Sequence, residues 1–203
     1  MIVFACLAPH PPLLLPGVGS EKNRLEVKKT IRSLEELGQE LAKSKPDLLI
    51  VSSPHPDWGF NVPLFFLNKN LKNTPVQKYL TNLDSPKEHF KKGIKIIEKI
   101  NPSKRIGWIA SGDMSHRLAK DGPYGLHPSG PKFDEKFIGL LKKKDVGGIL
   151  NLSPILIDEA GECGLRSFCI LLGALEKSKV NWRPKILSYE APFGVGYLTA
   201  RLI

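Results

Sequence analysis

The sequence predicts an α/β fold in which one sheet carries helices on both of its faces. Short apolar segments typical of strands alternate along the chain with longer amphipathic segments typical of helices. Three of the strand segments run into a loop that contains a histidine, at His10, His55 and His116. Because sites in open α/β sheets lie at the carboxyl ends of strands, we expect these imidazoles to meet in one crevice.

The predicted strands are short apolar segments bounded by turn residues. They comprise residues 2–7, 47–52, 105–110, 186–189 and 196–202. The first of them leads into the sequence ACLAPHPP, where three prolines surround His10. Prolines fix φ and remove backbone donors, so they stiffen this loop. A stiff loop at a strand end is suited to presenting a ligand.

The predicted helices have apolar residues near helical spacing. A long helix is expected over residues 21–44, with Ser20 as its N-cap and Pro46 after its end. The segment 62–67 is apolar and fits either a strand or a helix. Further helices are expected over residues 85–100, with Pro86 in the first turn, and over 132–143 and 154–177.

Length and composition indicate a single globular domain over residues 1–203, because 41% of the residues are hydrophobic and 25% are charged. The three cysteines have no paired spacing, so we expect no disulfide framework and a cytoplasmic location. The first residues lack a basic region, and no apolar run approaches a membrane span. Neither a signal peptide nor a membrane protein is expected.

The net charge of +10 is compatible with a nucleic acid, a membrane surface or another anionic partner. The lysines mostly lie on predicted helices, and the sequence has no RNA-binding signature and no recognition helix. We therefore interpret the charge as a lysine-rich solvated surface and expect no nucleic-acid or membrane partner. A binding protein for an anionic partner, without a metal, is the lowest-ranked of three functional hypotheses.

The histidine pattern indicates a metal site. Neutral imidazoles are common ligands of iron, zinc and copper, and two histidines with one carboxylate form the site of non-haem Fe(II) oxygenases. A third histidine outside the ligand set can serve as a general base. The segment EAGECGLRS offers Glu159, Glu162 and Cys163 as the third ligand.

Other polar residues have simpler interpretations. His89 lies within a predicted helix beside Glu88 and is interpreted as a surface residue. His127, in GLHPSGP, is either structural or faces the substrate. Glu190 is interpreted as a carboxylate that stabilises a loop through backbone amides. Cys6 and Cys169 are expected in the core.

Five motifs together resemble one known superfamily. They are APHPPLLLPGVG, VSSPHPDWG, ASGDMSHRL, EAGECGLRSF and SYEAPFGVGYLTA. In this order, over nearly the whole chain, they resemble the superfamily of class III extradiol ring-cleavage dioxygenase catalytic subunits. Within it, the sequence is similar to the Memo-like branch of the AmmeMemoRadiSam group.

The resemblance implies a three-layer α/β sandwich with a mostly parallel central sheet, and a non-haem Fe(II) site. By matching motifs it implies that His10 and His55 bind the metal and that His116 is the catalytic base. The third ligand is a glutamate in the dioxygenases and a cysteine in the Memo-like branch. Cys163 is therefore favoured here, with Glu162 as the alternative. A thiolate ligand would admit copper or zinc alongside iron.

One departure from the family pattern concerns the substrate pocket. Related proteins carry a longer stretch after the second histidine motif, which leads to an Asp-His-Gly before an apolar VPLxF segment. Here Asp57, Trp58 and Gly59 follow His55 directly. Trp58 thus stands where relatives have a pocket histidine, and its ring would either stack on a ring substrate or plug the pocket. We predict Trp58 and His127 as substrate-binding residues.

Two functions follow from the resemblance. The first is an Fe(II)-dependent extradiol dioxygenase that opens a catechol-like ring with O2. The second is a metal- or redox-binding accessory protein of a radical SAM system, without ring cleavage. The resemblance also implies a homo-oligomer and an AMMECR1-type or radical SAM partner on a separate chain.

Overall fold

The computed structural model describes residues 1–71 and 73–203. Its sheet has the strand order β3-β2-β4-β1-β6-β5. The first four strands in this order are parallel, whereas β6 is antiparallel to β1 and β5 is antiparallel to β6. The bounds are β1 (Ile2–Ala8), β2 (Leu48–Ser53), β3 (Val76–Leu80), β4 (Ile106–Ser111), β5 (Lys185–Glu190) and β6 (Tyr197–Arg201).

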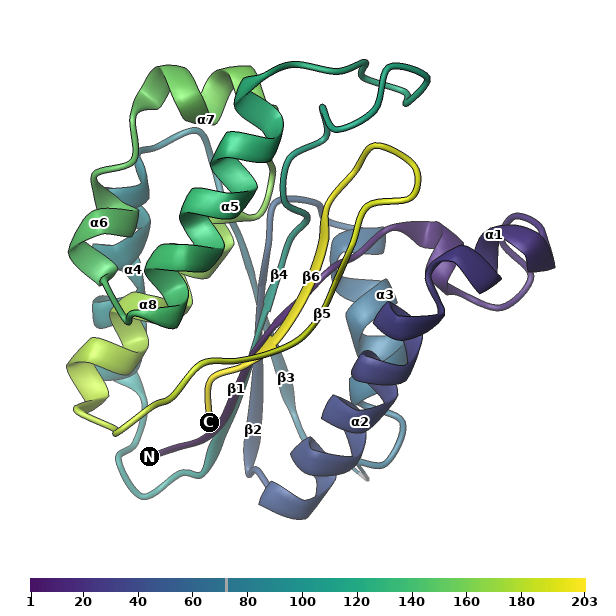
Figure 1. Ribbon diagram of the computed structural model, residues 1–203. Helices are drawn as coiled ribbons and strands as arrows, with labels where there is room; N and C mark the ends of the chain where they lie inside the picture. Colours follow the sequence, from purple (N-terminus) through teal and green to yellow (C-terminus); the bar gives the residue numbers. More distant parts are fainter. Residues whose placement is uncertain (72) are drawn as a thin grey trace.

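The helices form a layer on each side of this sheet (Figure 1). One layer contains α1 (Glu21–Glu26), α2 (Lys28–Ser44) and α3 (Trp58–Leu67). The other contains α4 (Pro86–Lys99), α5 (Ser129–Lys142), α6 (Val146–Leu150), α7 (Pro154–Ala160) and α8 (Leu165–Ser178). The predicted three-layer sandwich with a mostly parallel sheet is therefore confirmed.

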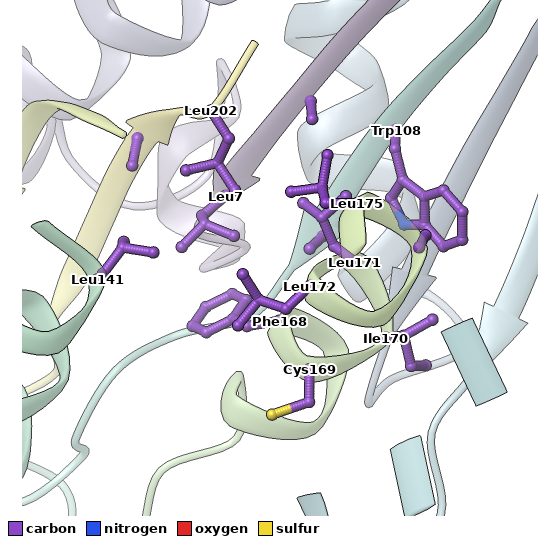
Figure 2. Close-up of a cluster of buried hydrophobic side chains, with 14 of the residues drawn as sticks. Leu7, Trp108, Leu141, Phe168, Cys169, Ile170, Leu171, Leu172, Leu175 and Leu202 are labelled. Carbon is purple, nitrogen blue, oxygen red and sulfur yellow. The ribbon is translucent and has the colours of Figure 1, made fainter. Parts of the chain in front are cut away.

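The strands place alternate side chains on opposite faces, as the two-residue period of a strand requires. In β4, Trp108 and Ala110 pack on the side of α8, whereas Ile109 packs on the side of α2 and α3. Figure 2 shows Trp108 and Leu7 beside Phe168 and Leu171 of α8. The central strands are buried on both faces and are mostly apolar, with buried serines near the carboxyl ends of β2 and β4.

Two of the predicted helices are interrupted in the structure. The segment 21–44 is divided at Val27, whose side chain is buried. Ser20 caps the first part by accepting a hydrogen bond from the Asn23 amide. The segment 154–177 is divided between Ala160 and Leu165, where Gly161 has a φ of +61°. This second interruption matters most, because it turns Cys163 towards the sheet edge.

Three further differences concern local interpretations. The ambiguous segment 62–67 is helical and belongs to α3. Strand β3 was not predicted, because it is an edge strand with largely exposed, polar residues. The interpretation of His89 as a surface residue is wrong: its side chain is buried, and its Nε2 accepts a hydrogen bond from the Asn82 amide. Its Nδ1 contacts the carbonyl of Ser85, so His89 ties the start of α4 to the preceding loop.

Helices α4 and α8 cross at a close contact made by two glycines. A β-carbon on Gly93 would overlap the carbonyl oxygen of Ile170, and one on Gly173 would overlap the carbonyl oxygen of Phe90. The two backbones therefore touch without intervening side chains. This contact fixes α8, and with it the segment that carries Cys163, against the rest of its layer.

Candidate metal centre

The site lies at the carboxyl edge of the parallel strands. His10 follows β1, His55 follows β2, and Asp113 and His116 follow β4. Since these strands are neighbours in the order β2-β4-β1, their loops share one corner of the sheet. Cys163 reaches the same corner from the segment between α7 and α8. The expected convergence of the three histidines is what the structure has.

Backbone hydrogen bonds fix the loop after β4. The Gly112 amide donates to the carbonyl of Ala8, which ties this loop to the end of β1. The Met114 amide donates to the carbonyl of Gly196, just before β6. The His116 amide donates to the carbonyl of Ala160, at the end of α7. These hydrogen bonds join the loop after β4 to three segments that are distant in sequence, and together the four segments form the base of the site.

His10 is the most deeply enclosed residue of the site, with 2% of its surface exposed. Its backbone amide donates to Oδ1 of Asp113 at 3.0 Å, and its Nδ1 lies 2.9 Å from Oγ of Ser111. Its Nε2 lies 3.5 Å from Sγ of Cys163. Burial, with a contribution from nearby His55, lowers the pKa of His10 to about 3. The imidazole is therefore neutral at pH 7, as a metal ligand must be.

His55 lies edge-on to His10, with ring centroids 5.2 Å apart. Its other side faces the indole of Trp58, at 4.9 Å and an interplanar angle of 32°. Burial lowers the pKa of His55, against an opposing effect of Asp113. The Trp58 side chain is 43% exposed, so it forms an outer wall of the site rather than part of the core.

His116 is half-buried and faces the same space from the β4 side. Its ring lies 5.1 Å from that of Tyr124, which is largely exposed. Its Nε2 is buried and has no hydrogen-bond partner among the residues described. Burial is the largest cause of a lowered pKa for His116, so the ring is neutral and this nitrogen is available to a bound molecule.

Among the described residues, two sets of donor atoms could hold a metal ion, each with its atoms within 4.8 Å of one another. One consists of His10, His55 and Cys163, and the other of Asp113, His116 and Cys163. Burial raises the pKa of the Cys163 thiol well above its ordinary value, so the thiol keeps its proton until a metal ion displaces it. Two neutral imidazoles and a sulfur form a donor set that suits iron, copper or zinc, so the residues present fit a transition metal.

Glu162 lines the cavity of the site, but its carboxylate is held by other contacts. It belongs to neither group found among the described residues. Its Oε2 accepts a hydrogen bond from the amide of Leu165, in the first turn of α8, and burial raises its pKa to about 7. Glu159 is engaged elsewhere, since it accepts a hydrogen bond from the hydroxyl of Ser129. Of the three residues proposed as third ligand, Cys163 is the one that forms a donor set with His10 and His55 among the described residues.

His127 and Glu190 have local roles. His127 does not line the site cavity within the part of the chain described; its Nδ1 accepts a hydrogen bond from the Ser129 amide at the start of α5. The structural alternative therefore fits His127 better than the substrate-facing one. Glu190 accepts hydrogen bonds from the amide and hydroxyl of Thr30, in the first turn of α2. It stabilises a junction through a backbone amide, as expected.

Asp113 and Tyr124 are site residues that the sequence reasoning missed. Asp113 is buried, and burial raises its pKa to about 6 despite the hydrogen bond from the His10 amide. The signal was present, because Asp113 precedes His116 by three residues in a loop that follows a buried strand. Tyr124 carried no comparable signal, since a long irregular loop brings it to the site.

The site opens into a cavity of about 600 Å³, lined by the three histidines and Cys163, with Trp58 and Tyr124 among its walls. Pockets of this volume hold small organic molecules. A neighbouring cavity of about 690 Å³ shares Gly161 and Glu162 with it, but has no histidine among its described lining residues. The histidine cluster therefore faces the smaller cavity.

The part of the chain that the structure describes contains no helix that is long and apolar enough to cross a membrane.

Comparisons with known proteins agree with this geometry. A family model described as the catalytic LigB subunit of aromatic ring-opening dioxygenase matches residues 53–200, which include His55, His116 and Cys163. The uncharacterized protein JW3007 of Escherichia coli K12 has a similar fold, with a TM-score of 0.55 at 16% identity. That similarity covers 99% of this chain and 100% of the other.

Protein CA_C1420 of Clostridium acetobutylicum is 29% identical over 268 residues, covering 97% of this chain and 56% of the relative. The chain therefore spans little more than half the length of this relative. Because the aligned region is longer than the 203 residues of this chain, the relative has residues within it that lack a counterpart here. The family model matches most of this chain, and the fold is an α/β sandwich. The chain therefore belongs to the LigB family of aromatic ring-opening dioxygenase catalytic subunits.

Proposed function

We propose that this protein is a non-haem Fe(II)-dependent extradiol-type dioxygenase that opens a catechol-like aromatic ring with O2. The observation that carries the proposal is the convergence of His10, His55, His116 and Cys163 on one cavity of about 600 Å³. Family membership supports the same chemistry. Both the identity of the metal, Fe(II), and the class of substrate, a catechol-like ring, belong to this proposal.

His10, His55 and Cys163 would hold the metal. When bound, it would act as a Lewis acid that lowers the pKa of a ring hydroxyl and brings the ring and O2 together. The protein supplies neutral imidazoles, a sulfur donor and a buried floor that limits access of water. Iron is the metal that the family implies, and the sulfur donor also admits copper or zinc.

His116 would act as the catalytic base. Its Nε2 is buried, neutral and without a partner among the described residues, so it can accept a hydrogen bond or a proton from a bound molecule. In the proposed reaction, this nitrogen takes a proton from a ring hydroxyl and returns it to the product. The resemblance of ASGDMSH to the dioxygenase motif supports this role.

Two aromatic rings would select the substrate. Trp58 and Tyr124 line the cavity on the sides of His55 and His116, respectively. Flat apolar walls favour a flat ring over an aliphatic ligand, because offset-stacked aromatic pairs gain about 0.5–1.5 kcal/mol beyond area burial. We therefore propose a small aromatic substrate.

The test is metal loading followed by oxygen uptake. The protein is loaded anaerobically with Fe(II), its metal content is measured, and O2 consumption is followed with a panel of catechols. We expect one Fe(II) per chain, O2 consumption and a ring-opened product. His10→Ala and His55→Ala should lose the metal, whereas His127→Ala, outside the cavity, should retain it. Fe(II) binding without O2 consumption by any catechol would refute ring cleavage.

A second function is favoured by the sulfur donor and by the shortened stretch after His55. We propose as the alternative a metal- or redox-binding accessory protein of a radical SAM system, because Cys163 stands where ring-cleaving relatives have a glutamate. It would work with an AMMECR1-type or radical SAM partner on a separate chain, as a cytoplasmic homo-oligomer. Under this alternative the metal binds in the same way, and a partner chain co-purifies, but no catechol consumes O2.

A further inference from the structure

Helix α3 contains a proline that removes one helical hydrogen bond. In an α-helix, the carbonyl of residue 59 accepts from the amide of residue 63. Residue 63 is Pro63, which has no N–H, so the carbonyl of Gly59 lacks its helical donor. A buried carbonyl without a donor costs free energy, so another group must supply one.

Ser111, the last residue of β4, supplies that donor. Its hydroxyl donates to the Gly59 carbonyl at 2.5 Å, and both groups are buried. A serine hydroxyl has one proton, and a carbonyl oxygen can only accept. The proton of Ser111 is therefore committed to Gly59. Towards any other group, Oγ of Ser111 can act only as an acceptor.

The other neighbour of Ser111 Oγ is the imidazole of His10. Nδ1 of His10 lies 2.9 Å from this oxygen. Because Ser111 has no proton left to donate, Nδ1 must carry the hydrogen and donate it. We propose that Ser111 is a positioning residue: with its proton drawn to the carbonyl that Pro63 leaves free, it holds His10 in the Nδ1–H tautomer.

The consequence falls on the opposite nitrogen. In this tautomer Nε2 of His10 carries a lone pair, and it faces Sγ of Cys163 at 3.5 Å. Two contacts could favour a proton on Nε2, namely this sulfur, which is a weak acceptor, and Oδ2 of Asp113. That oxygen lies 3.7 Å away, beyond hydrogen-bond length, while Oδ1 of Asp113 is engaged by the His10 amide. The shorter Ser111 contact therefore decides the tautomer.

The inference deepens the proposed function but is tested without metal or substrate. The tautomer is read by NMR of ¹⁵N-labelled histidine in the metal-free protein at pH 7, with the His10 signals identified by their loss in His10→Ala. We expect wild-type His10 almost entirely as Nδ1–H. Ser111→Ala removes the acceptor, so the Nε2–H form should appear. Ser52→Ala, which removes another buried serine that bonds to Ser167, serves as the control and should leave His10 unchanged.

A second variant tests the role of the proline without touching a polar side chain. Pro63→Ala restores an amide that can donate to the Gly59 carbonyl, which frees the Ser111 proton. The Nε2–H fraction of His10 should then rise, although every side chain around the imidazole is unchanged. Wild-type His10 as Nε2–H would overturn the proposal. An unchanged tautomer in folded Pro63→Ala would overturn the part assigned to the proline.

The same variants separate this inference from the metal site. Titration with Zn²⁺ alone should give an affinity about 10- to 100-fold lower for Ser111→Ala than for Ser52→Ala, as for other residues that orient a metal-binding histidine. The wild type could have the Nδ1–H tautomer and yet bind neither Zn²⁺ nor Fe(II). That result would support the role of Ser111 in setting the tautomer but refute the proposed function. Equal Zn²⁺ affinities of the two variants would refute the positioning role.

Discussion

Gly112 and Gly164 touch backbone to backbone, so that a β-carbon on Gly112 would overlap the α-carbon of Gly164. Gly112 follows β4, and Gly164 follows Cys163 directly. The Gly164 amide also donates to the carbonyl of Asp113 at 2.9 Å. This contact lets the segment between α7 and α8 lie directly on the loop after β4, which places the thiol of Cys163 beside the histidines.

Gly112→Ala should therefore disrupt the metal centre more than the fold. The methyl group would push the Cys163 segment away from His10, while the core layers lie elsewhere. We expect Zn²⁺ affinity to fall as far as in Cys163→Ala, with the sheet intact by circular dichroism. The measurement is a Zn²⁺ titration of both variants. Wild-type affinity in a folded Gly112→Ala would contradict this role of the contact.

The glycines between α4 and α8 should matter for stability instead. Gly93→Ala and Gly173→Ala each force a methyl group into a carbonyl of the facing helix, so we expect a loss of about 3 kcal/mol in the free energy of unfolding. Gly139→Ala is the matched control, because no described atom lies within 4 Å of its β-carbon position in α5. It should stabilise the protein by about 0.5–1 kcal/mol. Urea unfolding of the three variants measures the expected loss of stability in the first two and the expected gain in the third.

The identity of the third ligand can be decided by two substitutions. Cys163→Ala should abolish stoichiometric Fe(II) or Zn²⁺ binding, because the remaining set keeps only His10 and His55. Glu162→Gln should retain the metal, since its oxygen can still accept from the Leu165 amide. Metal content after loading and desalting is the readout. Loss of metal in Glu162→Gln, with retention in Cys163→Ala, would reverse the assignment.

The aromatic walls should contribute to ring binding. Trp58→Ala or Tyr124→Ala removes one stacking surface, so we expect catechol to bind about 3- to 10-fold more weakly to each Zn²⁺-loaded variant. Phe65→Ala is the control, because this exposed ring is also on α3 but does not line the cavity in the part of the chain described. Calorimetry under anaerobic conditions gives the affinities. Tighter binding to Trp58→Ala would indicate that the indole plugs the pocket.

Asp134 should make stability depend on pH. Burial raises the pKa of its carboxyl from 3.8 to about 6, although Tyr189 and the Ser115 amide donate to it. The folded state thus binds the proton more tightly than the unfolded state. Its contribution to stability falls as the pH rises from about 4 to about 6 and is constant above that.

Asp134→Asn removes this titration and keeps an oxygen for the Ser115 amide. The difference in free energy of unfolding, variant minus wild type, should increase by at most about 3 kcal/mol as the pH rises from 4 to 7. Urea titrations at several pH values give the difference curve. A flat difference between the two proteins would show that the folded carboxyl titrates normally.

Much of the fold could be predicted from local patterns. The strand that leads to His10 is apolar throughout, and the strand that leads to His55 is apolar up to Val51. This pattern favours buried strands but does not identify them alone, since the apolar segment 62–67 is helical. Because parallel strands end at the same edge of a sheet, the loops that follow them are expected at that edge. The histidines were found because they follow such strands.

The rest depends on contacts that a sequence does not display. The interruption of 154–177 is marked locally by Gly161, whose left-handed conformation ends α7, but the direction in which the chain then turns depends on tertiary contacts. His89 looked exposed beside Glu88, yet the loop before α4 encloses it. Tyr124 reaches the site through a long irregular loop. The shape of such a loop is set by backbone hydrogen bonds to distant residues such as Gly194.

The pairing of β6 with β1 has a consequence for the nascent chain. Strand β1 is synthesised long before Ala200 and Arg201, the residues of β6 that pair with it. Until then, Cys6 and Leu7 have an open sheet edge, which is an attachment point for other unfinished chains. Synthesis of this protein should therefore depend on chaperones that shield β1, and slow translation should promote aggregation.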